Sequence, residues 1–376
     1  GGIARWNAIR DRYAALVPHL AHRADLDYIF HEVAGEANAG HVYVQSGEMP
    51  SVARRPGGFL GAEIEAHPSG YFRIARILRG ENWEPANRSP LTETGVAVQD
   101  GEFLLAIDGV STQGVDNVYR LLENKAERLV ELEVAPVPDP ARARTVRVKT
   151  LAHERNLRYI DWVAARRALV DELSGGRIGY LHVPNTATEG NVELNKWYPA
   201  VAHKEALIID DRYNGGGFIP DRMIELVART PLNYWKRRGL EPQPTPLVSH
   251  AGPKAMLING LSSSGGDAFP YYFRKLGLGP LIGTRTWGGL IGISGNPSLA
   301  DGGSIQAATF RFMDTEGNWA VENEGVAPDI EVIDRPEAIA AGRDPSIEKA
   351  VEVLLGELAK NPPKKVVAPP APSEFR

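Results

Sequence analysis

The spacing of apolar and polar residues divides the chain into segments with different rhythms. Between residues 5 and 34, apolar side chains recur three and four positions apart, which is the period of a helix with one buried face. Glycines and an asparagine interrupt the pattern at 35–40, and a short apolar run at 41–44 predicts a strand. Residues 1–50 are therefore predicted to form a helical subdomain that ends in a strand.

Residues 55–137 have a different rhythm, in which short strands alternate with glycine turns. A continuous apolar run at 103–107 leads into the turn Asp108–Gly109. Short strands joined by Asp-Gly turns are typical of antiparallel sheets. This block is therefore predicted to be a small β domain, bounded by proline-rich linkers at 49–56 and 136–143.

Residues 144–360 alternate apolar strands with helices. The predicted strands are 178–183, 206–211, 255–258 and 281–284. Continuous apolar strands separated by helices indicate a mostly parallel sheet with both faces covered, so the fold class is predicted to be α/β with an added β domain. The last residues, 361–376, are rich in proline and lysine and are predicted to be a disordered tail.

The composition excludes several classes of function. The 376 residues include 42 basic and 47 acidic side chains, and the net charge of −5 gives no reason to expect a nucleic acid or an anionic membrane as a partner. The absence of cysteine excludes disulfides, a thiol nucleophile and thiolate metal sites. No apolar stretch reaches the roughly 18 residues of a membrane helix. His182, His203 and His250 lack the paired spacing of metal ligands, so no metal or other cofactor is expected.

The stretch Ile258–Phe269 carries the strongest chemical signal, because a buried strand ends there in a turn of small residues before a helix. A serine at this point lies at the carboxyl end of the sheet and beside a helix N-terminus that favours negative charge. By chemistry alone, Ser262, Ser263 and Ser264 are equal candidates for a nucleophile. The alternative is that these serines only cap a helix that starts at Ala268.

A second buried strand, at 207–211, runs into the glycine turn 215–217. Free amides of such a turn can form half of an oxyanion hole, in which each donor stabilises the transition state by about 2.7–4 kcal/mol. The alternative is a plain tight turn.

Four phrases in a fixed order resemble a known family. They are Asp211–Gly216, Ser264–Asp267, Gly283–Gly289 and Gly325–Ile330. Together with Gly101–Gly109, which resembles part of a PDZ domain, they resemble the tricorn proteases, serine peptidases related to the carboxyl-terminal processing peptidases. The resemblance implies a ClpP/crotonase-like α/β core with an N-terminal helical subdomain and an inserted PDZ-like domain.

The same resemblance implies a serine endopeptidase that hydrolyses peptides and unfolded polypeptides through an acyl-enzyme. Ser264 is the nucleophile by this resemblance, and amides of Gly265 and Gly217 hold the oxyanion. The competing interpretation is a non-catalytic scaffold of the same fold that binds a peptide or another ligand.

The resemblance also selects a general base. The lysine of the processing peptidases has no counterpart, because its position is Gly289 here and the nearby Lys275 is on another element. Tricorn-type enzymes instead take a histidine that follows a Gly-Glu phrase in the N-terminal helical domain. Gly35–Glu36 is such a phrase, so His41 is implied as the base, whereas His31 lies within the helix.

A carboxylate late in the chain orients the histidine in tricorn. The resemblance places it at Glu322, with Glu324 as the alternative. The family serine that precedes the histidine is Gly40 here, so whether Glu322 reaches His41 directly, through water or not at all stays open.

Substrate preference and assembly are inferred from the resemblance as well. The tricorn residue that shapes the pocket for the side chain before the cut is acidic, whereas its position falls near Trp235 here, so an apolar preference is expected. The resemblance further implies a homo-oligomer, a trimer or a hexamer, and a cytoplasmic location. Tricorn relatives carry propeller domains ahead of this region, so a chain that opens on Gly1 is expected to be a truncated form or a small relative.

Overall fold

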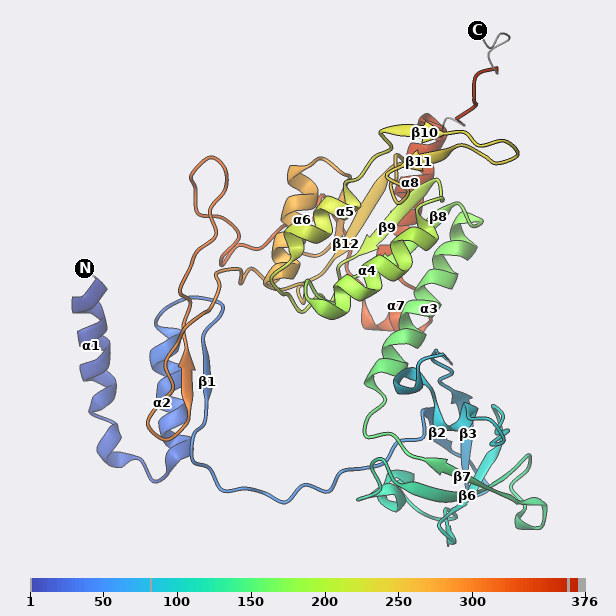
Figure 1. Cartoon of the computed structure of the whole chain (residues 1–376). Coiled ribbons are helices and arrows are strands. Elements are labelled where there is room, and N and C mark those ends of the chain that lie inside the picture. The colour runs from blue at the N-terminus through green and yellow to red at the C-terminus, as the bar shows by residue number, and fades with distance from the viewer. Residues whose placement is uncertain (1, 82, 364–365, 371–376) are drawn as a thin grey trace. The chain divides into compact units, whose positions relative to one another are not determined.

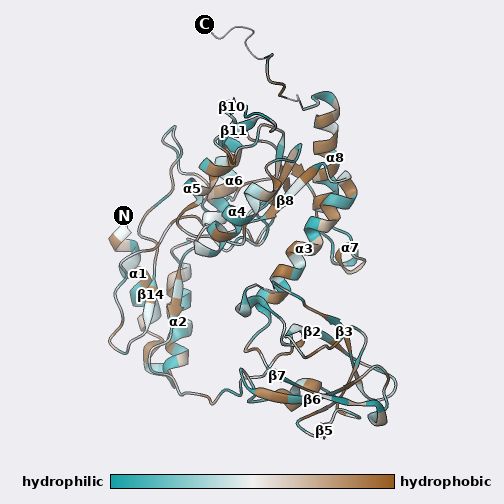
Figure 2. Cartoon of the chain, turned by 45° about the vertical axis from the view of Figure 1, so that its right-hand side comes forward, coloured by the Kyte–Doolittle hydropathy of each residue, from teal (hydrophilic) through white to brown (hydrophobic). Residues whose placement is uncertain are grey.

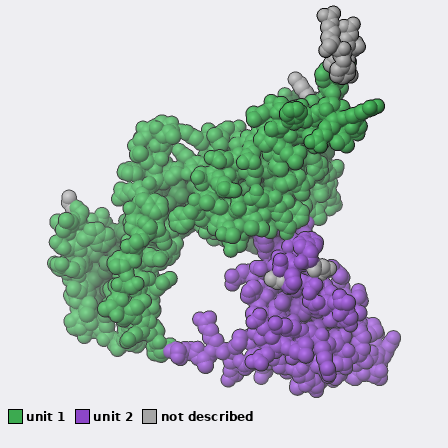
Figure 3. Space-filling model, in the orientation of Figure 1, with its two compact units in different colours: residues 1–50, 166–376 green, residues 51–165 purple. Residues whose placement is uncertain are grey.

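The computed structural model describes residues 2–81, 83–363 and 366–370, which form two compact units (Figure 1, Figure 3). One unit is Ser51–Ala165, and the other joins Gly1–Pro50 to Arg166–Arg376. The N-terminal piece therefore belongs to the same unit as the α/β domain. Part of the predicted disordered tail lies outside the described residues.

The inserted unit is an antiparallel sheet with a buried face. Its strands are β2 (Ala62–Ala66), β3 (Phe72–Ile77), β4 (Phe103–Ile107), β5 (Val110–Ser111), β6 (Leu129–Ala135) and β7 (Arg144–Lys149). Short 3-10 helices lie at Pro85–Asn87, Pro90–Thr92, Val118–Leu122 and Pro140–Arg142. The strand order is β2-β3-β4-β6-β7, with β5 beside β4. The predicted boundary at 137 falls short of this unit, because β7 pairs with β6 along its length.

The larger unit contains a parallel sheet, as predicted from the apolar strands of the sequence. Its strands are β8 (Ile178–His182), β9 (Ala206–Asp210), β12 (Lys254–Ile258), β13 (Leu281–Gly283) and β15 (Ile330–Glu331), in the order β15-β13-β12-β9-β8. Every residue of β8, β9 and β12 is buried, and in Figure 2 the hydrophobic colour (brown) gathers on the strands of this sheet. A sheet covered on both faces accounts for the apolar runs at 206–209 and 255–258.

Helices connect and cover these strands. They are α3 (Arg155–Ser174), α4 (Thr188–Val201), α5 (Pro220–Val227), α6 (Gly265–Lys275), α7 (Pro336–Ala340) and α8 (Pro345–Lys360). Figure 1 shows α4, α5 and α6 in front of the sheet and α8 behind it. The helix predicted from Ala268 begins earlier, at Gly265, because the Asp267 carboxylate accepts a hydrogen bond from the Ser264 amide and caps the first turn.

The N-terminal piece joins this unit through a small sheet. It consists of α1 (Gly2–Ala14), a 3-10 turn (Val17–His19), α2 (Arg23–Gly35) and β1 (Tyr43–Gln45). A long excursion of the chain at 290–313, here called the arm, contains β14 (Ser304–Gln306), which pairs antiparallel with β1 (Figure 1). Arg23 adds ion pairs to Asp27 and to Asp301 of the arm. These contacts attach the segment that follows α2 to the α/β core.

Two further observations complete the fold. A hairpin of β10 (Asn233–Trp235) and β11 (Gln243–Thr245) extends from the larger unit. Among the described residues, no helix has the length and apolarity needed to cross a membrane.

Candidate active site

Ser264 occupies the turn between β12 and α6, at the carboxyl end of the parallel sheet. Its backbone is strained, with φ 58° and ψ −113°, a combination that non-glycine residues avoid. The strain is held by Asp267, whose Oδ2 accepts the Ser264 amide at 2.7 Å and whose Oδ1 accepts the Thr286 hydroxyl at 2.5 Å and the Gly288 amide at 2.8 Å. Asp267 therefore fixes the direction in which the serine points.

The two neighbouring serines have other contacts. The Ser262 hydroxyl is fully buried and donates to the Asp211 carbonyl at 2.8 Å. The Ser263 hydroxyl faces the Asn214 carbonyl at 3.4 Å. Of the three candidates, Ser264 alone lines both hollows of the larger unit that His41 also lines.

His41 lies between α2 and β1 and is brought to Ser264 by the pairing of β1 with the arm. Its ring meets the edge of the Trp287 ring at a centroid distance of 5.6 Å and that of Tyr43 at 6.3 Å. His31, in contrast, uses its Nδ1 on the Asp27 carbonyl within α2.

The surroundings of His41 favour its neutral form. Burial lowers the pKa of His41 from the ordinary 6.5, although the negative charges of Glu322 and Asp267 act in the opposite direction. A neutral imidazole can accept a proton, which suits a general base at neutral pH. Nδ1 of His41 is buried, and the Ile291 backbone beside the ring also acts to raise the pKa of His41.

The Glu322 carboxylate holds the backbone next to His41 and does not bond to the imidazole ring itself. Its Oε1 accepts the Gly40 amide at 2.6 Å, and its Oε2 accepts the amides of Leu290 at 2.7 Å and Ile291 at 2.9 Å. The carboxylate thus joins the residue before His41 to the start of the arm, and its charge acts on the ring through space. Glu324 lines a separate hollow with Tyr271 and Lys275, so the structure does not bring it to His41.

The amides of Gly217 and Gly265 meet beside Ser264. Neither amide donates to an acceptor in the described part of the chain, and both residues line the hollow with His41. A Cβ on Gly265 would lie 1.9 Å from the Thr186 hydroxyl and 2.8 Å from the Gly217 nitrogen, so only glycine allows this approach. Two free amides next to a strained serine are the geometry of an oxyanion hole.

Asn214 joins the two loops that supply these amides. Its carbonyl accepts the Ser263 amide at 2.9 Å, and its side-chain oxygen accepts the Gly216 amide at 2.9 Å. Its side-chain nitrogen donates to the Val183 carbonyl at 3.0 Å. The backbone of Asn214 therefore ties the glycine turn to the serine turn, and its side chain holds the glycine turn against the end of β8.

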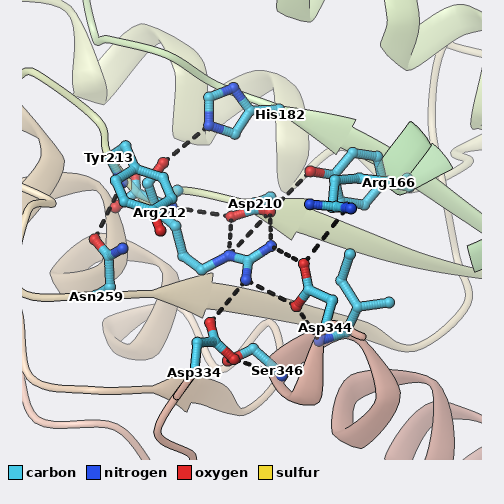
Figure 4. Close-up of polar contacts among 12 residues, drawn as sticks. Arg166, His182, Asp210, Arg212, Tyr213, Asn259, Asp334, Asp344 and Ser346 are labelled. Carbon is cyan, nitrogen blue, oxygen red and sulfur yellow. Dashed lines mark hydrogen bonds and ion pairs between the residues drawn. The ribbon is translucent and has the colours of Figure 1, made fainter. Parts of the chain in front are cut away.

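A buried ion cluster anchors the glycine turn from behind (Figure 4). The Arg212 side chain is 2% exposed and pairs with Asp210 at 2.7 Å, Asp334 at 2.9 Å and Asp344 at 2.9 Å. Asp344 also caps α8, and the Arg212 carbonyl accepts a hydrogen bond from His182 at 2.9 Å. The cluster thereby ties the start of the turn to β8, β9 and α8.

The first hollow, here called the catalytic pocket, has a volume of about 360 Å³ and walls that are mostly apolar. Besides Ser264, His41 and the two glycines, it is lined by Phe218, Pro220, Ala268, Tyr272, Leu290, Gly292, Ile293, Phe310, Arg311 and Phe312. Trp235 is not among these residues. It is 65% exposed on the β10–β11 hairpin, where its indole nitrogen donates to the Thr245 hydroxyl. The prediction that Trp235 shapes the substrate pocket, which came from sequence spacing, therefore does not fit the catalytic pocket of this structure.

Several residues of the site were missed at the level of sequence. Asp267 and Asn214 lie within phrases that carried the resemblance, but their hydrogen bonds cannot be read from spacing. The arm has few regular elements and so left no periodic signal, although it supplies Arg311 and much of the pocket wall. Among the described residues, no group of three or more His, Asp or Glu side chains is arranged to hold a metal ion.

Comparison with protein families assigns each part of the chain. Residues 2–35 match the tricorn protease C1 domain, residues 58–153 the tricorn protease PDZ domain, and residues 177–332 peptidase family S41. The three matches follow the order of the helical piece, the β unit and the α/β sheet.

Individual relatives agree with this assignment. Tricorn protease homolog 1 of Streptomyces coelicolor is 39% identical over 360 residues, which is 96% of this chain and 34% of the relative. Tricorn protease of Thermoplasma acidophilum is 32% identical over 350 residues, 93% of this chain and 32% of the relative. The crystal structure of the tricorn protease superposes with a TM-score of 0.88 at 32% identity, over 94% of this chain and 34% of that one.

The chain spans about a third of the length of these relatives. It matches them over nearly all of its own length, in sequence and in fold. The α/β domain matches peptidase family S41, and the chain as a whole belongs to the tricorn protease family.

Proposed function

We propose that the chain hydrolyses peptide bonds with Ser264 as nucleophile and His41 as general base. His41 takes the proton of the Ser264 hydroxyl as the oxygen attacks the peptide carbonyl. The amides of Gly217 and Gly265 stabilise the oxyanion, His41 protonates the leaving amine, and water then hydrolyses the acyl-enzyme. The observation that carries this proposal is the shared position of a strained serine, a neutral histidine and two free amides in one pocket.

The substrate class follows from the shape and polarity of the site. Phe218, Tyr272 and Phe312 make the walls of the catalytic pocket apolar, which supports an apolar side chain next to the cleaved bond. The second hollow beside Ser264 is lined by Leu261 and Trp287, and it leaves room for the part of the substrate peptide on the other side of the cleaved bond. Hollows on both sides support cleavage within peptides or unfolded polypeptides, and hence a role in peptide degradation.

Labelling with a fluorophosphonate tests the nucleophile. The probe is expected to form one covalent adduct on the wild-type chain, because the base and the oxyanion donors activate Ser264. Ser264→Ala is expected to lose the adduct, whereas Ser263→Ala keeps it. Intact-mass spectrometry provides the measurement. An adduct that persists in Ser264→Ala, or no adduct on the wild type, contradicts the assignment.

The pH dependence of kcat/KM tests the link between Glu322 and His41. His41 acts as a base only above its pKa, so the acid limb of the wild-type profile is expected below pH 6.5. Glu322→Gln removes a charge that raises this pKa, and the limb moves to lower pH. It also weakens the hold on the Gly40 amide, so kcat falls by about 10- to 100-fold.

The matched control is Glu324→Gln, which removes a carboxylate two residues away that lies in another hollow. Its profile is expected to follow that of the wild type. An acid limb that stays in place in Glu322→Gln would show that the carboxylate has no electrostatic link to the base.

Assembly and location are further parts of the proposal. Exposed apolar side chains on the N-terminal helices, Ile3 at 81%, Trp6 at 45% and Tyr28 at 64%, support association into a homo-oligomer, a trimer or a hexamer. A cytoplasmic location is proposed from the family resemblance alone. A non-catalytic scaffold is not favoured, because a binding protein needs neither the base nor the free amides.

A further inference from the structure

The loop that leads into β2 of the inserted unit presents two neighbouring backbone amides to one oxygen atom. Gly61 and Ala62 donate to Oε1 of Glu154 at 2.8 Å and 3.3 Å. Gly61 has a φ of 68°, and a Cβ there would lie 2.7 Å from the Ser89 hydroxyl, so a larger residue would disturb the turn that aims these amides. Two amides that converge on one oxygen form a site for an anion.

The Glu154 carboxylate is the anion that fills this site. Glu154 lies one residue before α3, and its side chain is only 4% exposed. Its Oε2 accepts from the Arg158 guanidinium at 2.8 Å and 3.1 Å, and Arg158 also donates to Glu63 of β2 at 2.6 Å. The same turn places Leu157, which is 1% exposed, against Gly61. The start of α3 therefore brings a carboxylate and an apolar side chain to the loop.

The surroundings of the site suit the end of a peptide. In the described part of the sheet, β2 is an edge strand, because only β3 pairs with it. The Tyr119 ring lies 5.9 Å from that of Phe59 in the loop, and the pKa of Tyr119 is raised by burial and by the charge of Glu154. Peptide ends are commonly bound as an added strand with the terminal carboxylate on backbone amides. Glu154 and Leu157 supply the same two groups as a carboxyl end with an apolar last residue.

We propose that the amides of Gly61 and Ala62 form a site for the carboxyl end of a peptide, and that Glu154 closes this site as a tethered occupant. A group tethered by a short segment competes at an effective concentration of about 1 mM or more. A free peptide at micromolar concentration therefore does not displace Glu154. The inserted unit stays closed to carboxyl ends until the start of α3 moves away.

This inference does not depend on the peptidase activity proposed above. Gly61, Ala62 and Glu154 belong to the inserted unit, and none of them lines the catalytic pocket. Binding to the closed site can therefore be measured without turnover, and a failure of either proposal leaves the other standing.

Peptide binding to variants of the full chain tests the proposal. Each variant carries Ser264→Ala so that the peptide is not cleaved. The probe is a short fluorescent peptide of alanine and glycine that ends either in a free valine or in valine amide. Glu154→Ala is expected to bind the free form about tenfold more tightly than Ser264→Ala alone, because the two amides become available for charge-assisted hydrogen bonds. The amidated form is expected to bind both chains equally. Fluorescence anisotropy measures Kd.

The matched control is Glu131→Ala, which removes a carboxylate of β6 that is 42% exposed and pairs with Arg147. Its affinity for both forms is expected to equal that of Ser264→Ala alone. Hydrogen exchange followed by mass spectrometry localises the binding, since the free form should slow exchange of the amides at 58–64 in Glu154→Ala. A gain in affinity with protection only in another part of the chain would overturn the proposal.

Glu154→Gln is the second variant, in case removal of the buried side chain prevents folding. Glutamine keeps an oxygen for the two amides but carries no charge, so it holds them less strongly than the carboxylate does. The free form is expected to bind this variant about threefold more tightly than Ser264→Ala alone. No gain for the free form in the Glu154 variants, or protection of 58–64 by micromolar peptide while Glu154 is still present, would refute the closed site.

Discussion

Replacement of His41 by glutamine is expected to lower kcat/KM by about 10⁴- to 10⁶-fold, because an amide cannot accept the proton of the Ser264 hydroxyl. The side chain keeps a similar length, so the contacts of β1 with the arm remain. The loss should appear in kcat, with peptide binding retained. Steady-state kinetics on a peptide with a central phenylalanine provides the measurement.

The control for this variant is His31→Gln. His31 lies on α2, and its Nδ1 contacts the Asp27 carbonyl outside the catalytic pocket. Its replacement is expected to change kcat/KM by no more than about twofold. Unchanged turnover in His41→Gln, with the fold intact by circular dichroism, would remove His41 from the mechanism.

Arg212→Leu is expected to lower the free energy of unfolding of the larger unit by about 3–5 kcal/mol. The substitution leaves Asp210 without its cation and Asp344 with only the longer pair to Arg166 at 3.6 Å, and both carboxylate side chains are at most 1% exposed. Turnover should also fall, since the glycine turn loses its anchor next to the oxyanion donors. Urea unfolding followed by circular dichroism gives the stability, and peptide cleavage gives the activity.

Asp344→Asn is the milder companion in case Arg212→Leu fails to fold. It keeps a hydrogen-bond acceptor for the guanidinium and is expected to cost about 1–3 kcal/mol. The control is Arg177→Leu, because the Arg177–Glu205 pair lies on the surface, with side chains 42% and 37% exposed. Its effect on stability is expected to be small. Equal losses in Arg177→Leu and Arg212→Leu would contradict the role given to burial.

The parallel sheet was the part of the fold most open to prediction from the sequence. Residues 206–209 and 255–258 are unbroken apolar runs, and a sheet covered on both faces buries every residue of such a strand. The end of the β unit was less predictable. The alternating strand at 144–149 fits either neighbouring domain, and its partner β6 is known only from the sheet itself.

The residues of the site also differ in how well the sequence predicts them. Ser264, Gly265 and Gly217 lie in turns directly after apolar strands, so local sequence already points to them. His41 was suggested by a family resemblance, since nothing local distinguishes it from His31. The pocket wall was not predictable, because the arm approaches Ser264 through contacts with β1, and Trp235 was assigned to the pocket by spacing alone.

The way His41 is held has a consequence for how such an enzyme can change over evolutionary time. Every residue of the hydrophobic cluster around β8, β9 and β12 comes from positions 181–326, and none comes from the first fifty residues. The part of the chain that carries Ser264 therefore forms its hydrophobic core without the N-terminal residues. The segment that carries His41 is attached to it by the three residue pairs between β1 and β14 and by a few polar contacts. Mutations in the N-terminal piece can therefore alter or abolish proton transfer while the hydrophobic cluster stays intact. Catalytic activity and the stability of the α/β core can change independently in evolution.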